Sequence, residues 1–180
     1  MKDLAKVIKS PVLGAEKEIW DLVDGEGRRT GVLYDRNSGD PIPDGLRFSV
    51  VEVWTRVGDK VITTQRHPDK WAGLCWEVTG GGVLATETER AAAVRELREE
   101  IGITVLEDEL LHLGRLIKES VMIDSYLLVL DVMPTLTLQP GEVVSAALRT
   151  REEMEDLRPE LTRGTSERLT LYGDIVFGSR

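Results

Sequence analysis

Three glutamates within one short segment have the types and spacing of a metal-binding cluster. Glu96, Glu99 and Glu100 lie at positions i, i+3 and i+4, so on a helix, at about 100° per residue, their side chains share roughly a third of the circumference. Like charges at this spacing destabilise a helix. Bound cations relieve the repulsion, and carboxylate oxygens suit Mg²⁺ or Mn²⁺. The cluster therefore predicts a divalent-metal site, with a solvated acidic helix face as the plainer alternative.

The neighbouring residues suggest how such a cluster is held. Arg95 precedes Glu99 by four positions, which is the spacing of a helical ion pair, so it is predicted to orient that carboxylate. Upstream, Gly80 begins a run of three glycines. A glycine backbone can approach a metal or a phosphate closely.

A helix must carry these side chains, and the apolar periodicity predicts it over Glu87–Ile101. Thr86 followed by Glu89 has the pattern of a capping box, which predicts the start of the helix there. The apolar stripe that would pack on the rest of the protein consists of Ala93, Val94, Leu97 and Ile101.

The complete pattern is longer than the cluster. It runs Gly81, five residues, Glu87, seven residues, Arg95-Glu96-Leu97, one residue, Glu99-Glu100, one residue, Gly102-Ile103. This matches the Nudix box at every fixed position, and the chain resembles the Nudix hydrolase family. The resemblance implies an α/β/α sandwich in which the box forms a loop–helix–loop. It also implies cleavage of a nucleoside diphosphate linked to another group X, or of a related small diphosphate, with Mg²⁺ or Mn²⁺ as cofactor.

The resemblance further implies roles for individual residues. Arg95 would brace Glu99, which is the first choice as the general base. Some family members take the base from outside the box, and Glu142 is the outside candidate in this chain. The implied metal ligands are Glu96, Glu99, Glu100, the Gly80 carbonyl and Glu87, the last of which would either hold the loop or bind a more weakly attached metal.

The remaining segments predict an α/β fold with a mixed sheet. The predicted strands are Phe48–Val57, Lys60–Thr64, Trp76–Thr79, Leu111–Ile117, Val121–Val132 and Val143–Arg149, and the further predicted helices are Arg151–Leu157 and Ser166–Phe177. Before them, Glu18–Asp24 and Thr30–Tyr34 predict a β-hairpin. We therefore expect an N-terminal arm and hairpin over 1–45 and a Nudix domain over 46–180.

The hairpin region is similar to Nudix proteins related to isopentenyl-diphosphate isomerase, which leaves an isomerase as an alternative. That enzyme's pattern requires a cysteine five residues past Trp76 and a histidine two residues later, where this chain has Gly81 and Val83. Cys75 lies before the tryptophan, and no histidine precedes His67. A third interpretation is a non-catalytic domain that senses a ligand, although such domains usually have eroded boxes.

Residues outside the box are candidates for substrate binding. Arg66 and Lys70 lie in a polar loop and are predicted to grip a phosphate, with ordinary solvated side chains as the alternative. Tyr126, together with Trp54 and Trp71, is a candidate for stacking on a base or sugar.

Composition limits the partners. The 180 residues carry a formal net charge of −9, which disfavours binding to a nucleic-acid backbone. Cys75 is the single cysteine, so no disulfide can form within the chain. No apolar run approaches the roughly 20 residues of a membrane span, and the N-terminus lacks a signal-peptide pattern. We therefore expect a cytoplasmic enzyme acting on a small-molecule diphosphate. Many relatives are dimers, which leaves a homodimer as an alternative, and neither X nor the oligomeric state can be identified from the sequence.

Overall fold

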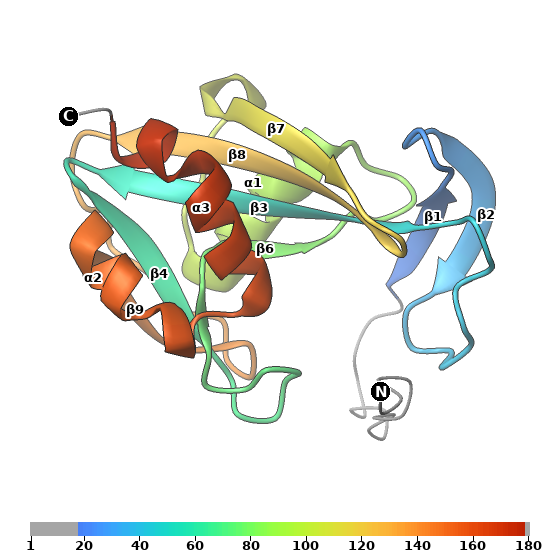
Figure 1. The fold of residues 1–180 in the computed structure, drawn as a ribbon, viewed down its shortest axis with the longest axis horizontal. Helices are drawn as coiled ribbons and strands as arrows, with labels where there is room; N and C mark the ends of the chain where they lie inside the picture. Colours follow the sequence, from blue (N-terminus) through green and yellow to red (C-terminus); the bar gives the residue numbers. More distant parts are fainter. Residues whose placement is uncertain (1–17, 179–180) are drawn as a thin grey trace.

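A mixed seven-stranded sheet forms the centre of the protein (Figure 1). The computed structural model describes residues 18–178, so the arm expected over 1–17 lies outside the described residues. Strand order is β5-β4-β3-β8-β7, with β6 also paired to β3 and β9 to β4. The parallel pair is β3 with β8, and the other pairs are antiparallel. The strands are β3 (Phe48–Val57), β4 (Lys60–Arg66), β5 (Trp76–Glu77), β6 (Thr79–Gly82), β7 (Leu111–Ile117), β8 (Val121–Leu130) and β9 (Val143–Arg149).

Helices cover both faces of this sheet, which confirms the expected α/β/α sandwich. Figure 1 shows α3 (Arg163–Phe177) in front of β3 and α1 (Glu89–Ile101) behind it. Side chains alternate along β3, so Val51 and Val53 join a core with α1, whereas Trp54 joins a second core with α3 and α2 (Arg151–Asp156). Short 3₁₀ turns occupy Glu107–Glu109 and Arg158–Glu160.

The N-terminal hairpin expected from the sequence is present as a separate two-stranded sheet. It consists of β1 (Ile19–Val23) and β2 (Arg29–Asp35), which pair antiparallel. Three backbone hydrogen bonds join it to the domain. The amide of Val23 donates to the carbonyl of Arg47 at 2.8 Å, the reverse bond measures 2.9 Å, and the amide of Ala85 donates to the carbonyl of Ile19 at 2.8 Å. In Figure 1 the hairpin lies at one end of the sheet, beyond the start of β3.

The triple glycine belongs to a strand rather than to a loop after one. The segment predicted as a single strand at Trp76–Thr79 is divided into β5, which pairs with β4, and β6, which pairs with β3. In β6, Gly80 lies opposite Glu52 and Gly81 lies opposite Val51. This pairing holds the glycine backbone against the centre of the sheet.

Helix ends differ from the prediction in two places. The capping box predicted at Thr86 is wrong, because α1 begins at Glu89, two residues after the predicted start at Glu87. Thr88 caps the helix, and its hydroxyl accepts a hydrogen bond from the amide of Ala91 at 3.1 Å. The last helix begins before the predicted start at Ser166, with Thr162 as its cap. Between residues 18 and 178 there is no helix with both the length and the apolar character needed to cross a bilayer.

Candidate active site

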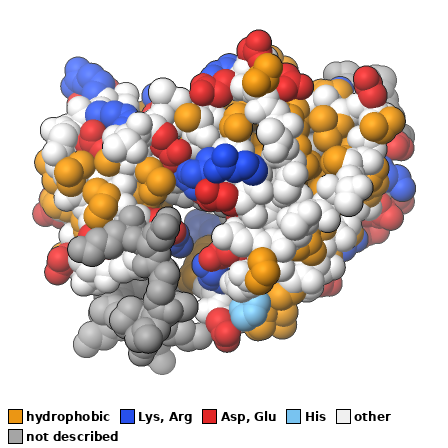
Figure 2. All heavy atoms as spheres, turned by 180° about the vertical axis from the view of Figure 1, so that it is seen from behind, with side chains coloured by type: hydrophobic (Ala, Val, Ile, Leu, Met, Phe, Trp, Pro, Cys, Tyr) orange, Lys and Arg blue, Asp and Glu red, His pale blue; other side chains and the backbone are white. Residues whose placement is uncertain are grey.

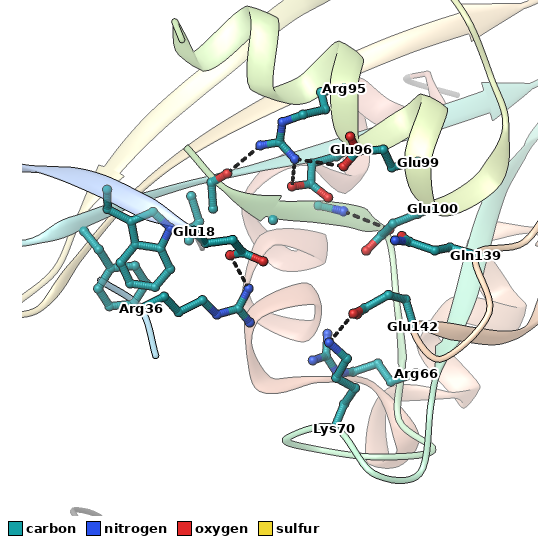
Figure 3. A pocket seen from close by; sticks show the side chains of 16 residues that line it. Glu18, Arg36, Arg66, Lys70, Arg95, Glu96, Glu99, Glu100, Gln139 and Glu142 are labelled. Carbon is teal, nitrogen blue, oxygen red and sulfur yellow. Dashed lines mark hydrogen bonds and ion pairs between the residues drawn. The ribbon is translucent and has the colours of Figure 1, made fainter. Parts of the chain in front are cut away.

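A cavity of about 220 Å³ lies where the hairpin, β6 and α1 meet two loops (Figure 3). Its lining carries five glutamates, three arginines and one lysine. Figure 2 shows a hollow near the middle of one face of the molecule, with acidic and basic side chains around it. The charged lining residues are Glu18, Arg36, Arg66, Lys70, Arg95, Glu96, Glu99, Glu100 and Glu142.

Helix α1 directs the three box glutamates into this cavity. Ala93, Leu97 and Ile101 are fully buried against the sheet, and this fixes the rotation of the helix. The adjacent side then carries Glu100, which is 8% exposed, and Glu99, whose side chain is 40% exposed. The helix therefore presents one deeply buried carboxylate and one that solvent can reach.

Arg95 is the centre of the hydrogen-bond network at this site. Its guanidinium donates to Glu87 at 2.6 Å, to Glu96 at 2.7 Å and to Glu99 at 3.1 Å. It also donates to the backbone carbonyl of Gly82 at 2.8 Å. One arginine thus connects the loop before α1, the end of β6 and two of the predicted metal ligands.

The glycines of β6 allow α1 to approach. A Cβ atom at Gly81 would lie only 2.2 Å from a carboxylate oxygen of Glu96, so no larger residue fits there without moving that side chain. The neighbouring amide of Gly80 donates to the Glu100 carboxylate at 3.3 Å. Gly81 therefore allows close packing between β6 and the acidic side of α1, whereas a Cβ atom at Gly80 would lie 2.3 Å from the Val51 carbonyl of β3.

Burial favours the neutral form of two of the three box glutamates. It raises the pKa of Glu96 to about 7, an effect that the charge of Arg95 partly offsets and that Glu99 and Glu18 reinforce. Burial also raises the pKa of Glu100 well above its ordinary value, and the charge of Glu96 adds to the shift. Two such carboxylates in one cavity are stabilised as anions only by added positive charge.

The residues present fit a divalent cation. Carboxylate oxygens are hard ligands of the kind that Mg²⁺ and Mn²⁺ prefer. Among residues 18–178, however, no three acidic, histidine or cysteine side chains already converge on one cation position. The hydrogen bonds explain this, because Arg95 holds Glu96 and Glu99 while the amide of Gly80 holds Glu100. Cation binding therefore requires these carboxylates to turn away from their present partners.

The two residues predicted to bind phosphate do line the cavity, although Arg66 is the last residue of β4 and not a loop residue as predicted, and each is already paired. Lys70 forms an ion pair with Glu142, the proposed base from outside the box. Arg66 donates to Glu77 at 2.5 Å and to the backbone carbonyl of Trp71 at 2.8 Å. Arg66 thus also fixes the shape of the loop that follows β4.

The comparisons with known proteins agree with this geometry. The family model of the NUDIX domain matches residues 44–171. The chain belongs to the Nudix family. This Nudix protein is accordingly a hydrolase that acts on pyrophosphate bonds, and the matched residues leave out the β1–β2 hairpin.

Relatives support the assignment over most of the chain. An uncharacterised Nudix hydrolase of Listeria monocytogenes is 31% identical over 147 residues, covering 78% of this chain and 85% of the relative. Among solved structures, the protein DR0079 from Deinococcus radiodurans has a TM-score of 0.72 at 23% identity, covering 86% of this chain and 98% of that one.

A second structural neighbour was solved with a nucleotide and a metal ion. It is a bifunctional NMN adenylyltransferase/ADP ribose pyrophosphatase from Francisella tularensis, complexed with AMP and a Mn ion. Its TM-score is 0.62 at 17% identity, and the match covers 72% of this chain and 42% of that one. At this identity the neighbour supports the fold alone.

The structure corrects one predicted substrate-binding residue. Tyr126 is 3% exposed and packs in the core between α1 and the sheet, away from the cavity. The guanidinium of Arg90 lies 5.5 Å from the centre of its ring. Trp54 is likewise fully buried, and Trp71, although 74% exposed, does not line this cavity. Stacking on a base or sugar is therefore not available to Tyr126 or Trp54.

Besides residues of β3 and β6, four residues that were not expected from the sequence as site residues line the cavity. Glu18, Trp20 and Arg36 come from the hairpin, and Gln139 comes from the turn before β9. No local pattern marks them, because their place depends on how the hairpin docks on β6.

Proposed function

We propose that this Nudix protein hydrolyses the diphosphate linkage of a nucleoside diphosphate joined to another group X, or of a related small diphosphate, with Mg²⁺ or Mn²⁺ as cofactor. The observation that carries the proposal is the joint placement of Glu96, Glu99 and Glu100 beside Arg95 in one charged cavity. The neighbour whose name includes ADP ribose pyrophosphatase, solved with AMP and a Mn ion, supports the same class of substrate.

Metal binding is assigned to the three box glutamates, with Gly80 and Glu87 as the further predicted ligands. A divalent cation, when bound, neutralises the diphosphate and lowers the pKa of an attacking water. Burial raises the pKa of both Glu96 and Glu100, so they suit this role because a bound cation would supply positive charge that stabilises their ionised forms. Glu87 contacts Arg95 at 2.6 Å and accepts the amide of Leu84 at 2.8 Å, so it also holds the loop before α1.

The general base is assigned to Glu99. Its side chain is 40% exposed, so a water molecule can reach it, and Arg95 fixes one of its oxygens at 3.1 Å. An ionised carboxylate held in this way can accept the proton of the attacking water. Glu142 stays the second candidate, and its use would require the ion pair to Lys70 to open.

The test is product release from a panel of diphosphates, measured with Mg²⁺ and with EDTA. The panel contains ADP-ribose, a nucleotide sugar, a dinucleoside polyphosphate, an oxidised nucleoside triphosphate and isopentenyl diphosphate. Glu99→Gln is expected to reduce kcat by about 10²- to 10⁴-fold, which is the usual contribution of a general base. Glu142→Gln is expected to have a much smaller effect.

Controls separate chemistry from folding. Glu152→Gln changes an exposed glutamate on α2 and is expected to leave kcat unchanged, and circular dichroism checks that each variant is folded. If folded wild-type protein binds Mg²⁺ but cleaves nothing in the panel, the hydrolase proposal fails in favour of a ligand sensor. Conversion of isopentenyl diphosphate to its alkene isomer would instead support the isomerase.

A further inference from the structure

The hairpin is attached directly to the loop that carries the box. The carbonyl of Ile19 accepts the amide of Ala85 at 2.8 Å, and Arg29 donates to the carbonyl of Ala85 at 3.0 Å and to that of Glu87. Trp20 closes the remaining gap, because a Cβ atom at Gly82 would lie 2.6 Å from its indole nitrogen. Residues on the hairpin therefore keep a defined position relative to the predicted metal ligands.

An arginine on this hairpin is held in place over an aromatic ring. Trp20 is 8% exposed and stacks on Phe48, with ring centres 4.9 Å apart and planes 18° apart. The guanidinium of Arg36 lies 5.8 Å from the centre of the Trp20 ring, within the range of a cation–π contact. Its Nη1 also donates to Glu18 at 2.6 Å. Figure 3 shows Arg36 and Glu18 on one side of the cavity, with Glu99 and Glu100 across it.

Arg36 is the basic lining side chain with the most capacity left for a ligand. Within the part of the chain that the structure describes, Arg95 is bonded to three glutamates and a carbonyl, and Arg66 to a glutamate and a carbonyl. Lys70 is paired with Glu142. Among residues 18–178, Arg36 has a single hydrogen-bond partner, Glu18, and the two side chains are 43% and 41% exposed. An exposed pair of this kind contributes little stability and exchanges readily for a better anion.

We propose that Arg36 is a substrate-binding residue that contacts the group X and favours an X that carries further negative charge, such as an additional phosphate or a carboxylate. This inference rests on the proposed function, because it requires the diphosphate itself to be bound on the α1 side of the cavity. A guanidinium can donate two parallel hydrogen bonds to a phosphate or a carboxylate. The ion pair between Glu18 and Arg36 then opens, while the cation–π contact with Trp20 keeps the guanidinium in place.

The experiment compares substrate pairs that differ chiefly in the charge of X. The first pair is UDP-glucose and UDP-glucuronate, and the second is diadenosine diphosphate and diadenosine tetraphosphate. For the more anionic member of each pair, Arg36→Gln is expected to raise KM by roughly 10- to 100-fold, as for the loss of a hydrogen bond to a charged group. For the other member the change is expected to stay within about 3-fold, and kcat is expected to change less than KM for both.

Two further variants define the controls. Arg28→Gln removes an arginine from the same hairpin that is paired with Asp24 and Glu26 in the turn and does not line the cavity, so its kinetics are expected to match wild type. Arg36→Lys keeps the charge without the paired donors and is expected to restore part of the affinity for the anionic member. A purely structural role for Arg36 would affect both members equally and would lower thermal stability.

The outcomes are decisive in each case. Equal effects on both members of a pair, or no effect, overturn the role of Arg36 while leaving the hydrolase intact. If wild type cleaves none of the four compounds, their affinities are measured by calorimetry with Ca²⁺ in place of Mg²⁺. A preference for the anionic member that Arg36→Gln abolishes then supports the inference although the hydrolase proposal fails for these substrates, whereas equal affinities overturn the inference.

Discussion

Two buried glutamates, Glu52 and Glu100, lie on opposite faces of the paired strands β3 and β6, and the residues around them differ. Glu52 of β3 is 5% exposed and faces α3, where it meets the guanidinium of Arg168, the hydroxyl of Ser125 at 2.7 Å and the indole N–H of Trp54 at 3.1 Å. Glu100 of α1 is 8% exposed, and the bond given to it by the described residues is one amide N–H, from Gly80.

The difference separates a structural acid from a functional one. Gly80 lies directly opposite Glu52 in the β3–β6 ladder, so the two carboxylates occupy neighbouring places in the same framework. The α3 side supplies a buried cation from the protein itself. On the α1 side, Arg95 pairs with Glu96 and Glu99, but no cationic side chain among the described residues pairs with Glu100, so the charge that would stabilise its anion is left to a ligand.

The largest expected effect is on stability at the Glu52 side. Glu52→Gln leaves Arg168, which is 8% exposed, as a buried charge without its partner, and the free energy of unfolding is expected to fall by about 3–5 kcal/mol. Urea titration measures it. The double variant Glu52→Gln with Arg168→Met is expected to recover most of the loss, because it removes both charges. An unchanged unfolding free energy in the single variant would contradict the structural role.

The next largest expected effect is on activity, at Glu100 on the α1 side of the sheet. Glu100→Gln is expected to reduce metal-dependent hydrolysis by about 100-fold or more, since a metal ligand supports several kcal/mol of transition-state stabilisation. Folded Glu52→Gln, by contrast, is expected to keep kcat per folded molecule within a few-fold of wild type. Equal loss of activity in the two variants would contradict the assignment of Glu52 to structure and Glu100 to function.

A third effect links metal and stability. With Mg²⁺ at about 100 times its dissociation constant, the melting temperature of wild type is expected to rise by about 5–10 °C. Glu100→Gln is expected to lose this rise and to be more stable than wild type in EDTA, because it removes a buried acid with a raised pKa. Differential scanning calorimetry with and without Mg²⁺ measures both changes. A full Mg²⁺ response in Glu100→Gln would contradict its role as a ligand.

The smallest effect concerns Tyr126, the residue that the structure moves from the site to the core. Burial raises the pKa of Tyr126 from 10.0 to about 12, with the charge of Asp124 adding to the shift. The unfolded chain loses this proton at lower pH than the folded protein, so the stability contribution is complete below pH 10 and declines as the pH rises toward 12. In Tyr126→Phe the free energy of unfolding is expected to decline less steeply than in wild type as the pH rises from 10 toward 12. The KM of this variant at neutral pH is expected to match that of wild type.

The helix and its glutamates were predictable because their pattern is local. Spacing within one helix turn places Glu96, Glu99 and Glu100 together whatever the rest of the chain does. The β-branched and aromatic residues of Phe48–Val57 likewise predicted β3 with its observed bounds. Thr86 was a wrong cap because Thr88, two residues later, has the same chemistry and lies nearer the first residue of the helix.

The remaining parts of the site depend on contacts between distant segments. Arg36 reaches the cavity only because Trp20 docks against Gly82, and no spacing rule connects those positions. Tyr126 was mistaken for an exposed aromatic because β8 is buried over most of its length and so lacks an alternating pattern. The domain boundary at 45/46, the dimer and the cytoplasmic location stay predictions.

The fit of Trp20 against Gly82 has a consequence for protein engineering. Because the indole occupies the space that any side chain at position 82 would need, the hairpin and the end of β6 form a matched pair. If Arg36 binds X as proposed, grafting this hairpin onto another Nudix scaffold is expected to transfer that preference best where the recipient has glycine at the position of Gly82. Conversely, the added carbon of Gly82→Ala would displace the Trp20 indole, so if Arg36 binds X as proposed, this substitution is expected to weaken that contact while leaving every charged residue of the site unchanged.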